Sequence, residues 1–169
     1  PNTDYYDLFS RQRSYAGNTE VMFWKKFDNG LGKGEAAFRR EVNYRQRTPN
    51  ERSQTKELAD SYLCTDGKPI TGNALFKGFD NIGLEMQNRD PRFFQTFGMP
   101  GIPWVIKANG AITNYDALYT ILNQGIEQYS PTGYVLRKGY DAREIYQIPQ
   151  YEETPGIIYR YAEVLLNYA

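Results

Sequence analysis

The chain has 169 residues, and its 20 Lys and Arg balance its 20 Asp and Glu, so the net charge is zero. This balance gives no electrostatic reason to bind nucleic acid or an anionic membrane. Histidine is absent and Cys64 is the only cysteine, which excludes Ser-His and Cys-His nucleophilic catalysis and an internal disulfide.

Aromatic residues are the unusual part of the composition. The chain contains 15 Tyr, 9 Phe and 2 Trp, which is 15% of its length. Flat rings serve either a loop-rich core or an exposed platform on which sugars dock, and for any single ring the core is the commoner place. A zinc site would have to be built almost wholly from carboxylates, and we expect neither a metal nor any other cofactor.

The first third of the chain predicts short elements joined by long loops. Residues 1–18 indicate the end of a helix or a turn-rich entry, and residues 20–27 indicate a short strand that stops at the Asp-Asn-Gly turn of residues 28–30. Residues 35–56 are rich in arginine and predict a long, solvated surface loop. Guanidinium and amide groups beside rings in this loop also suit the hydroxyls of a sugar.

Two motifs mark the middle of the chain. Residues 57–63 predict a short helix, and the Asp-Gly pair after it predicts a sharp turn in which Asp66 bonds to its own backbone. In the Arg-Asp-Pro-Arg run of residues 89–92, Asp90 is placed to cap a helix that has the proline at its first position. We expect the two arginines of this run, Arg89 and Arg92, to reach nearby carboxylates.

The Asn-Gly pair at 109–110 is a hairpin signal, so residues 104–108 and 111–114 are expected to pair. Apolar residues at helical intervals predict a helix over residues 115–129. Residues 134–140 predict a strand, and an acidic and aromatic loop leads from there to the last element.

Residues 155–169 predict an amphipathic helix that follows a Pro-Gly breaker. Its apolar face needs a partner surface and carries Ile158, Ala162, Leu165, Leu166 and Ala169. Arg160 and Glu163 are spaced to pair across one turn of this helix. No stop signal follows the helix and the chain starts with a proline, so we expect residues 1–169 to be a single partial domain, truncated at both ends.

Five segments, in order, resemble the SusD/RagB family of outer-membrane nutrient-binding lipoproteins. The final helix, RYAEVLLNYA at 160–169, resembles the signature helix of the family, and RDPRF at 89–93 is a complete family motif. TDGKPI at 65–70 is similar to the family's x-D-G-x-P-I turn. Residues 18–23 and 134–140 resemble the family's n-x-E-v-i-f and g-y-x-x-r-K-y strands. The matching segments span residues 18–169, which is nearly the whole chain.

The resemblance implies a mostly α fold of the α+β class, with a tetratricopeptide-like helical scaffold and a loop-rich mixed region of short strands and hairpins. It also implies a non-catalytic lipoprotein of the bacterial outer membrane that binds oligosaccharides or glycans at the cell surface. Such a protein hands its ligand to a SusC-like TonB-dependent transporter. The lipid-anchor segment is expected to lie outside these residues, and a peptide-binding member of the family is the alternative.

The ligand contacts are predicted from the residues of this chain, because binding residues vary among members of the family. We predict that rings stack on the sugar and that polar groups bind its hydroxyls at Tyr44, Arg45, Trp104 and Trp24.

Two other functions were considered. One is a glycoside hydrolase, whose paired carboxylates would be Glu152 with Glu153 or Asp66 with Glu85. Neither pair lies in a recognisable motif, so we expect no catalytic residue. The other is a pure protein-interaction scaffold of repeated helices.

Overall fold

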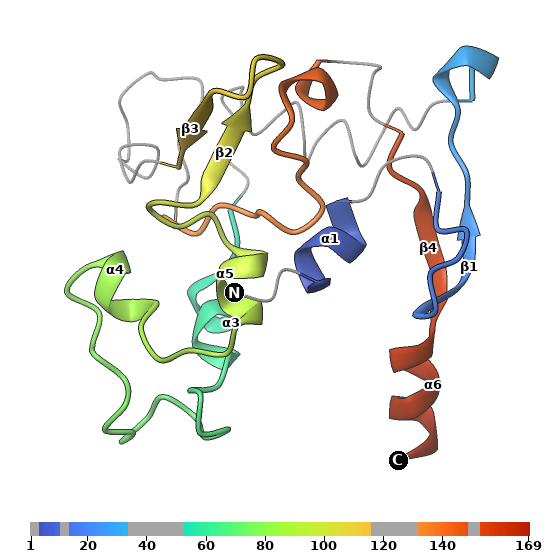
Figure 1. Ribbon diagram of the computed structural model, residues 1–169. Helices are drawn as coiled ribbons and strands as arrows, with labels where there is room; N and C mark the ends of the chain where they lie inside the picture. Colours follow the sequence, from blue (N-terminus) through green and yellow to red (C-terminus); the bar gives the residue numbers. More distant parts are fainter. Residues whose placement is uncertain (1–3, 11–13, 34–52, 116–131, 149–152) are drawn as a thin grey trace.

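The computed structural model describes residues 4–10, 14–33, 53–115, 132–148 and 153–169. In this part, five short α-helices accompany two antiparallel sheets of two strands each (Figure 1). The fold is therefore mixed α+β, as expected. The longest described helix, α6, has eight residues. The tetratricopeptide-like scaffold stays a prediction.

The first sheet joins two segments that lie far apart in the sequence. Strand β1 (Val21–Lys25) pairs antiparallel with β4 (Gly156–Arg160), and Figure 1 shows the two strands side by side. The side-chain oxygen of Asn18 accepts hydrogen bonds from the N–H groups of Glu20 and Val21, both at 2.9 Å, and so turns the chain into β1. The strand predicted over residues 20–27 is confirmed.

The prediction of a single helix over residues 155–169 is wrong in its first third. Gly156–Arg160 is β4, and α6 (Tyr161–Tyr168) begins only after it. Two consecutive isoleucines and a tyrosine favour an extended backbone, and β1 supplies the hydrogen-bonding partners. Ile158 therefore lies on a strand. In the described structure the apolar side chains of α6, among them Leu165 and Leu166, are exposed.

A second correction concerns Arg160, which was expected to pair with Glu163 across one helical turn. Arg160 is extended and precedes α6. Its guanidinium donates to Glu20 at 3.2 Å instead. The backbone N–H of Tyr161 also donates to the carbonyl of Glu20, at 2.7 Å. The start of α6 is thus fixed by the residue that precedes β1.

Helices α1 (Asp4–Ser10), α3 (Lys56–Ser61), α4 (Ile82–Glu85) and α5 (Arg92–Thr96) are short. Thr55 caps α3 and Asn81 caps α4, each by accepting a backbone N–H with its side chain. The helix predicted over residues 57–63 is confirmed as α3, although it ends before Tyr62. Two 3₁₀ turns, η1 (Asn29–Leu31) and η4 (Glu144–Gln147), complete the regular structure of the described residues.

The Asp-Gly turn has the predicted form. The Asp66 carboxylate accepts the N–H of Lys68 at 3.1 Å, and Gly67 has a positive φ of 75°. That backbone conformation favours glycine, because it strains residues that carry a Cβ.

The Arg-Asp-Pro-Arg run starts α5, with two differences from the prediction. Asp90 accepts the N–H of Arg92 at 2.8 Å, but the helix begins at Arg92, so the proline precedes the first helical residue. Arg92 pairs with the Asp90 carboxylate, as expected. Arg89 was expected to reach a carboxylate; it is buried, and its guanidinium donates to the backbone carbonyls of Ala59 and Tyr62.

The Asp90–Arg92 pair predicts a pH-dependent contribution to stability. Hydrogen bonds from Arg92 lower the pKa of the Asp90 carboxyl, so this pair stabilises the fold above the ordinary aspartate pKa and loses its effect as the pH falls through the lowered value. We expect Asp90→Asn to lower the free energy of unfolding by at most about 1 kcal/mol at pH 7, because the pair is partly exposed. Urea titrations should find a smaller difference near pH 2. An equal difference at both pH values would contradict this assignment.

Two clusters of buried side chains form the described core. The Phe93 cluster consists of Ala59, Phe93, Phe97, Met99 and Tyr134, which come from α3, from α5 and the loop after it, and from the segment of residues 132–148. The Trp104 cluster consists of Trp104, Tyr115, Tyr140 and Ala142. The rings in these two clusters serve packing, which is the commoner role of aromatic side chains.

The predicted hairpin is confirmed as β2 (Pro103–Ile106) paired with β3 (Ile112–Asn114). The predicted strand over residues 134–140 is wrong, because that segment makes only an isolated bridge, between Leu136 and Phe97. Backbone hydrogen bonds to Gln54, Thr96 and Gly98 hold it in place, together with its side chains. Tyr134 donates to the buried Glu85 carboxylate at 2.8 Å, and Tyr140 donates to the carbonyl of Trp104 at 2.6 Å.

Among the described residues, no helix combines the length and the apolar character that crossing a membrane requires.

Candidate functional site

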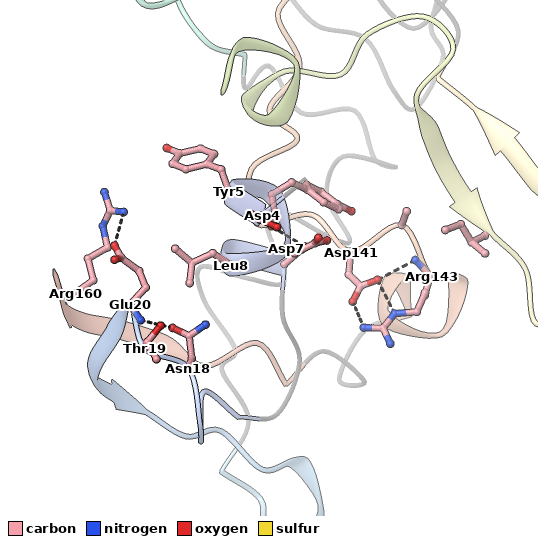
Figure 2. A pocket seen from close by; sticks show the side chains of 14 residues that line it. Asp4, Tyr5, Asp7, Leu8, Asn18, Thr19, Glu20, Asp141, Arg143 and Arg160 are labelled. Atoms are coloured by element: carbon pink, nitrogen blue, oxygen red, sulfur yellow. Dashed lines mark hydrogen bonds and ion pairs between the residues drawn. The ribbon is translucent and has the colours of Figure 1, made fainter. Parts of the chain in front are cut away.

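An open cleft of about 890 Å³ lies beside helix α1. Its lining comes from α1, from the turn before β1, from the end of β4 and from the segment after Tyr140. Figure 2 shows the Glu20–Arg160 pair on one side of α1 and the Asp141–Arg143 pair on the other. A volume of this order is typical of sites for small ligands. We call this region the α1 cleft.

The first wall of the cleft presents a fork of two hydrogen bonds between Arg143 and Asp141. Nε of Arg143 donates to one carboxylate oxygen at 3.0 Å and Nη2 donates to the other at 2.6 Å. The carboxylate is buried, with 6% of the side chain exposed, whereas 53% of the Arg143 side chain is exposed. The hydrogen bond to Asp141 raises the pKa of the Arg143 guanidinium. Arg143 is therefore a fixed cation whose outer edge faces solvent.

The second wall presents the Glu20–Arg160 pair. Nη1 of Arg160 donates to Oε1 of Glu20 at 3.2 Å, and about a third of each side chain is exposed. The N–H of Ala162 points to the same oxygen at 3.4 Å. These contacts tie the turn before β1 to the start of α6, so the wall depends on the pairing of β1 with β4.

Helix α1 contributes two tyrosines to the cleft lining. The N–H of Tyr6 donates to the buried side chain of Gln95 at 2.9 Å, which fastens α1 to α5. The Arg137 guanidinium lies 3.8 Å from the centre of the Tyr6 ring, and burial raises the pKa of the Tyr6 phenol. Lys138 donates to the Tyr5 hydroxyl at 2.7 Å. Both rings are therefore held by cations on neighbouring segments.

Of the four residues that were predicted to contact the ligand, the structure describes Trp104 and Trp24. Trp104 is 4% exposed, and its ring stacks on Tyr140 and meets Tyr115 edge-on. Stacking on a sugar needs an accessible ring face, which Trp104 does not offer. Trp24 is half-buried and lies edge-on to Tyr15. Tyr44 and Arg45 lie outside the described residues, as does the helix predicted over residues 115–129.

One exposed ring pair occurs where no ligand contact was predicted. Phe23 on β1 and its cross-strand partner Tyr159 on β4 stack with centroids 6.5 Å apart and ring planes 23° apart. Each residue is 56% exposed. Cross-strand aromatic pairs stabilise a two-stranded sheet.

The α1 cleft was missed at the level of sequence, although one signal for it was available. Residues 90–92 and 141–143 share the pattern Asp-x-Arg. In both places the aspartate accepts the backbone N–H and the Nε–H of the arginine two residues later. The local geometry of Arg143 was therefore readable from the sequence. Its place on a cleft wall depends on tertiary packing.

Of the two carboxylate pairs considered for a hydrolase, only Asp66 with Glu85 lies wholly within the described residues, and its two members have different surroundings. Glu85 is buried against Tyr134, whereas Asp66 lies on an exposed turn and accepts hydrogen bonds from Asn73. Glu153 accepts the N–H of Asn29 at 3.1 Å, and Glu152 lies outside the described residues. Within the described residues, no group of three or more potential ligating side chains is placed to hold a metal ion.

The structure thus defines a mixed α+β protein with an open cleft of ligand size that is lined by both charged and apolar side chains. A family model described as the SusD family matches residues 8–169. The chain belongs to the SusD family. No curated protein and no solved structure matches it significantly. The resemblance found in five segments is therefore confirmed at the level of the family.

Proposed function

We propose that this protein binds oligosaccharides at the surface of the bacterial outer membrane without cleaving them. In this proposal it is a lipoprotein that passes its ligand to a SusC-like TonB-dependent transporter. The observation that carries the proposal is membership of the SusD family over residues 8–169, because the family resemblance implies nutrient binding. Tyr44, Arg45 and Trp24 remain proposed contacts, and the α1 cleft is added as the main binding site.

The side chains of the α1 cleft support this choice. Sugar hydroxyls both donate and accept hydrogen bonds, so they suit walls on which guanidinium donors stand beside carboxylate acceptors. The Asp141–Arg143 and Glu20–Arg160 pairs supply both kinds of group. Because both pairs are held in place before the ligand arrives, little side-chain entropy is lost on binding.

Arg143→Ala tests the cleft directly. We expect the affinity for a retained polysaccharide to fall about tenfold or more, because a hydrogen bond to a charged group contributes about 1.5–3 kcal/mol. Affinity electrophoresis against a panel of neutral polysaccharides gives the retardation. Isothermal titration with an oligosaccharide from the retained polymer gives Kd.

Arg92→Ala is the matched control. Arg92 forms the same fork with the aspartate two residues earlier and is 59% exposed, yet it does not line the cleft. Its substitution should leave Kd unchanged. Equal effects of the two substitutions would remove Arg143 from the site. Because Arg143→Ala removes the cation that pairs with a buried carboxylate, circular dichroism must first show that the variant is folded. Arg143→Lys, which keeps the charge, is the second variant.

The same panel separates the proposal from its alternatives. If the protein bound peptides and none of the polysaccharides, this result would favour a peptide-binding member of the family. Release of reducing sugar from any polymer would identify a glycoside hydrolase. Capture of the transporter by the protein in the absence of any soluble ligand would favour an interaction scaffold.

A further inference from the structure

We infer that the α1 cleft selects neutral sugar chains and rejects acidic ones, such as uronate-containing or carboxymethylated polymers. The inference rests on the proposed function and goes one step further, because it names the chemical class of the ligand. The supporting observation is that each arginine on the cleft walls is already paired with a carboxylate of the protein.

Arg143 shows this arrangement most clearly. Two of its three guanidinium nitrogens, Nε and Nη2, face the Asp141 carboxylate. Nη1 makes no hydrogen bond to a described residue and lies on an exposed side chain. This nitrogen is therefore available to a hydroxyl oxygen of a ligand. A ligand carboxylate would meet a cation whose charge is already compensated by the buried Asp141.

Arg160 repeats the arrangement on the opposite wall. Only Nη1 of its guanidinium has a hydrogen-bonding partner among the described residues, Glu20, at 3.2 Å. The remaining donors can serve a hydroxyl, and the Glu20 carboxylate stands beside them. A ligand carboxylate that used these donors would lie beside Glu20, whose negative charge repels it and already compensates the charge of Arg160.

Helix α1 adds negative charge between the two walls. Asp4 and Asp7 both line the cleft, and Figure 2 shows them between the two ion pairs. The described lining thus contains four carboxylates, Asp4, Asp7, Glu20 and Asp141, and two guanidinium groups, Arg143 and Arg160. Like charges at close range oppose binding, and they do so most strongly at low ionic strength. Uncharged hydroxyls escape this penalty.

The experiment compares two polymers that share one backbone. Each neutral polysaccharide that retards the protein in affinity electrophoresis is paired with its own carboxymethylated derivative, at low and at high salt. We expect the derivative to bind at least tenfold more weakly at low salt, with a smaller difference at high salt. Equal or tighter binding of the derivative at low salt would overturn the inference while leaving the proposed function intact. Failure of every polysaccharide to bind would instead overturn the proposed function, and the inference with it.

Glu20→Gln then tests the cause. The amide keeps the shape and an oxygen acceptor for Arg160, but it removes the compensating charge. We expect the ratio of acidic to neutral affinity to rise about fivefold or more. Asp141→Asn makes the same change on the other wall and should shift the ratio in the same direction. Glu57→Gln, on the exposed surface of α3 and outside the cleft lining, is the matched control and should leave the ratio unchanged. An unchanged ratio in both cleft variants would show that these carboxylates do not set the selectivity.

Discussion

Replacing Arg89 with methionine should lower the free energy of unfolding by about 3 kcal/mol or more. The residue is 1% exposed, and Nη2 donates to the carbonyls of Ala59 and Tyr62 at 2.5 and 3.0 Å. Its guanidinium also lies 4.4 Å from the centre of the Phe93 ring. Methionine fills much of the space but donates nothing. The Tyr62 carbonyl then loses the donor shown for it in the described structure, and the Ala59 carbonyl keeps only the N–H of Tyr62 at 3.4 Å. A buried carbonyl left without a donor costs about 1–3 kcal/mol, and the packing of the guanidinium on the Phe93 ring is lost as well.

Arg92→Met is the control for this prediction, because the two arginines flank the same Asp-Pro pair. The Arg92 side chain is 59% exposed and pairs with Asp90 at the surface, so its loss should cost less than about 1 kcal/mol. Urea unfolding at pH 7, followed by circular dichroism, measures both variants. Similar losses for Arg89→Met and Arg92→Met would mean that the buried hydrogen bonds of Arg89 contribute little to stability.

Replacing Trp104 with alanine should lower the free energy of unfolding by about 3–5 kcal/mol, which is usual for an aromatic side chain removed from a core. The ring stacks on Tyr140, with centroids 4.3 Å apart, and meets Tyr115 at 4.9 Å. The packing is tight enough that a Cβ on Gly98 would lie 3.1 Å from the Trp104 ring. The cavity left by alanine therefore cannot close without moving several rings.

Because of the expected loss of stability, Trp104→Ala cannot be used to test whether Trp104 contacts the ligand. Loss of polysaccharide retardation in Trp104→Ala would report unfolding, so Trp104→Phe is the useful variant for binding. We expect Trp104→Phe to fold and to be retarded like the wild type. If this variant is folded and fails to bind, Trp104 belongs to the site after all. Trp24→Ala, at a half-buried ring, should cost clearly less stability than Trp104→Ala.

Local signals in the sequence predicted local structure well. The Asn-Gly pair gave the β2–β3 hairpin, because that turn type depends on two residues. The Asp-Gly turn at residues 66–67 was found for a similar reason. In both turns the stabilising contacts lie within a few residues of the signal, so no knowledge of the tertiary structure was needed. The strand β1 was found from its residue types, although its pairing partner β4 is distant in the sequence.

The errors have a common physical origin in partners that are distant in sequence. The apolar spacing of residues 158–169 fits a helix, and only the presence of β1 makes residues 156–160 a strand. Arg89 was assigned to a carboxylate because the end of α3, which supplies its acceptors, lies some thirty residues earlier. Trp104 was placed on a loop, where the sequence could not reveal that Tyr115 and Tyr140 cover it.

The candidate site was less predictable than the fold. The α1 cleft combines residues from the two ends of the described chain, and neither wall contains a recognised binding motif. The sequence predicted ligand contacts at Tyr44, Arg45, Trp24 and Trp104, of which only the two tryptophans lie within the described residues. The family itself was recognisable, because its motifs are short, contiguous sequence segments that are present in this chain.

The pairing of β1 with β4 has a consequence for biosynthesis. Residues 21–25 are synthesised before residues 156–160, so β1 cannot pair with β4 until the segment between them has been made. Closing a loop of that length is slow, because the chain must bring distant ends together before any hydrogen bond rewards it. We therefore expect this sheet to form late in folding. Until then β1 leaves its backbone hydrogen-bonding groups unpaired beside the apolar side chains of Met22 and Phe23, which stay exposed even in the finished sheet.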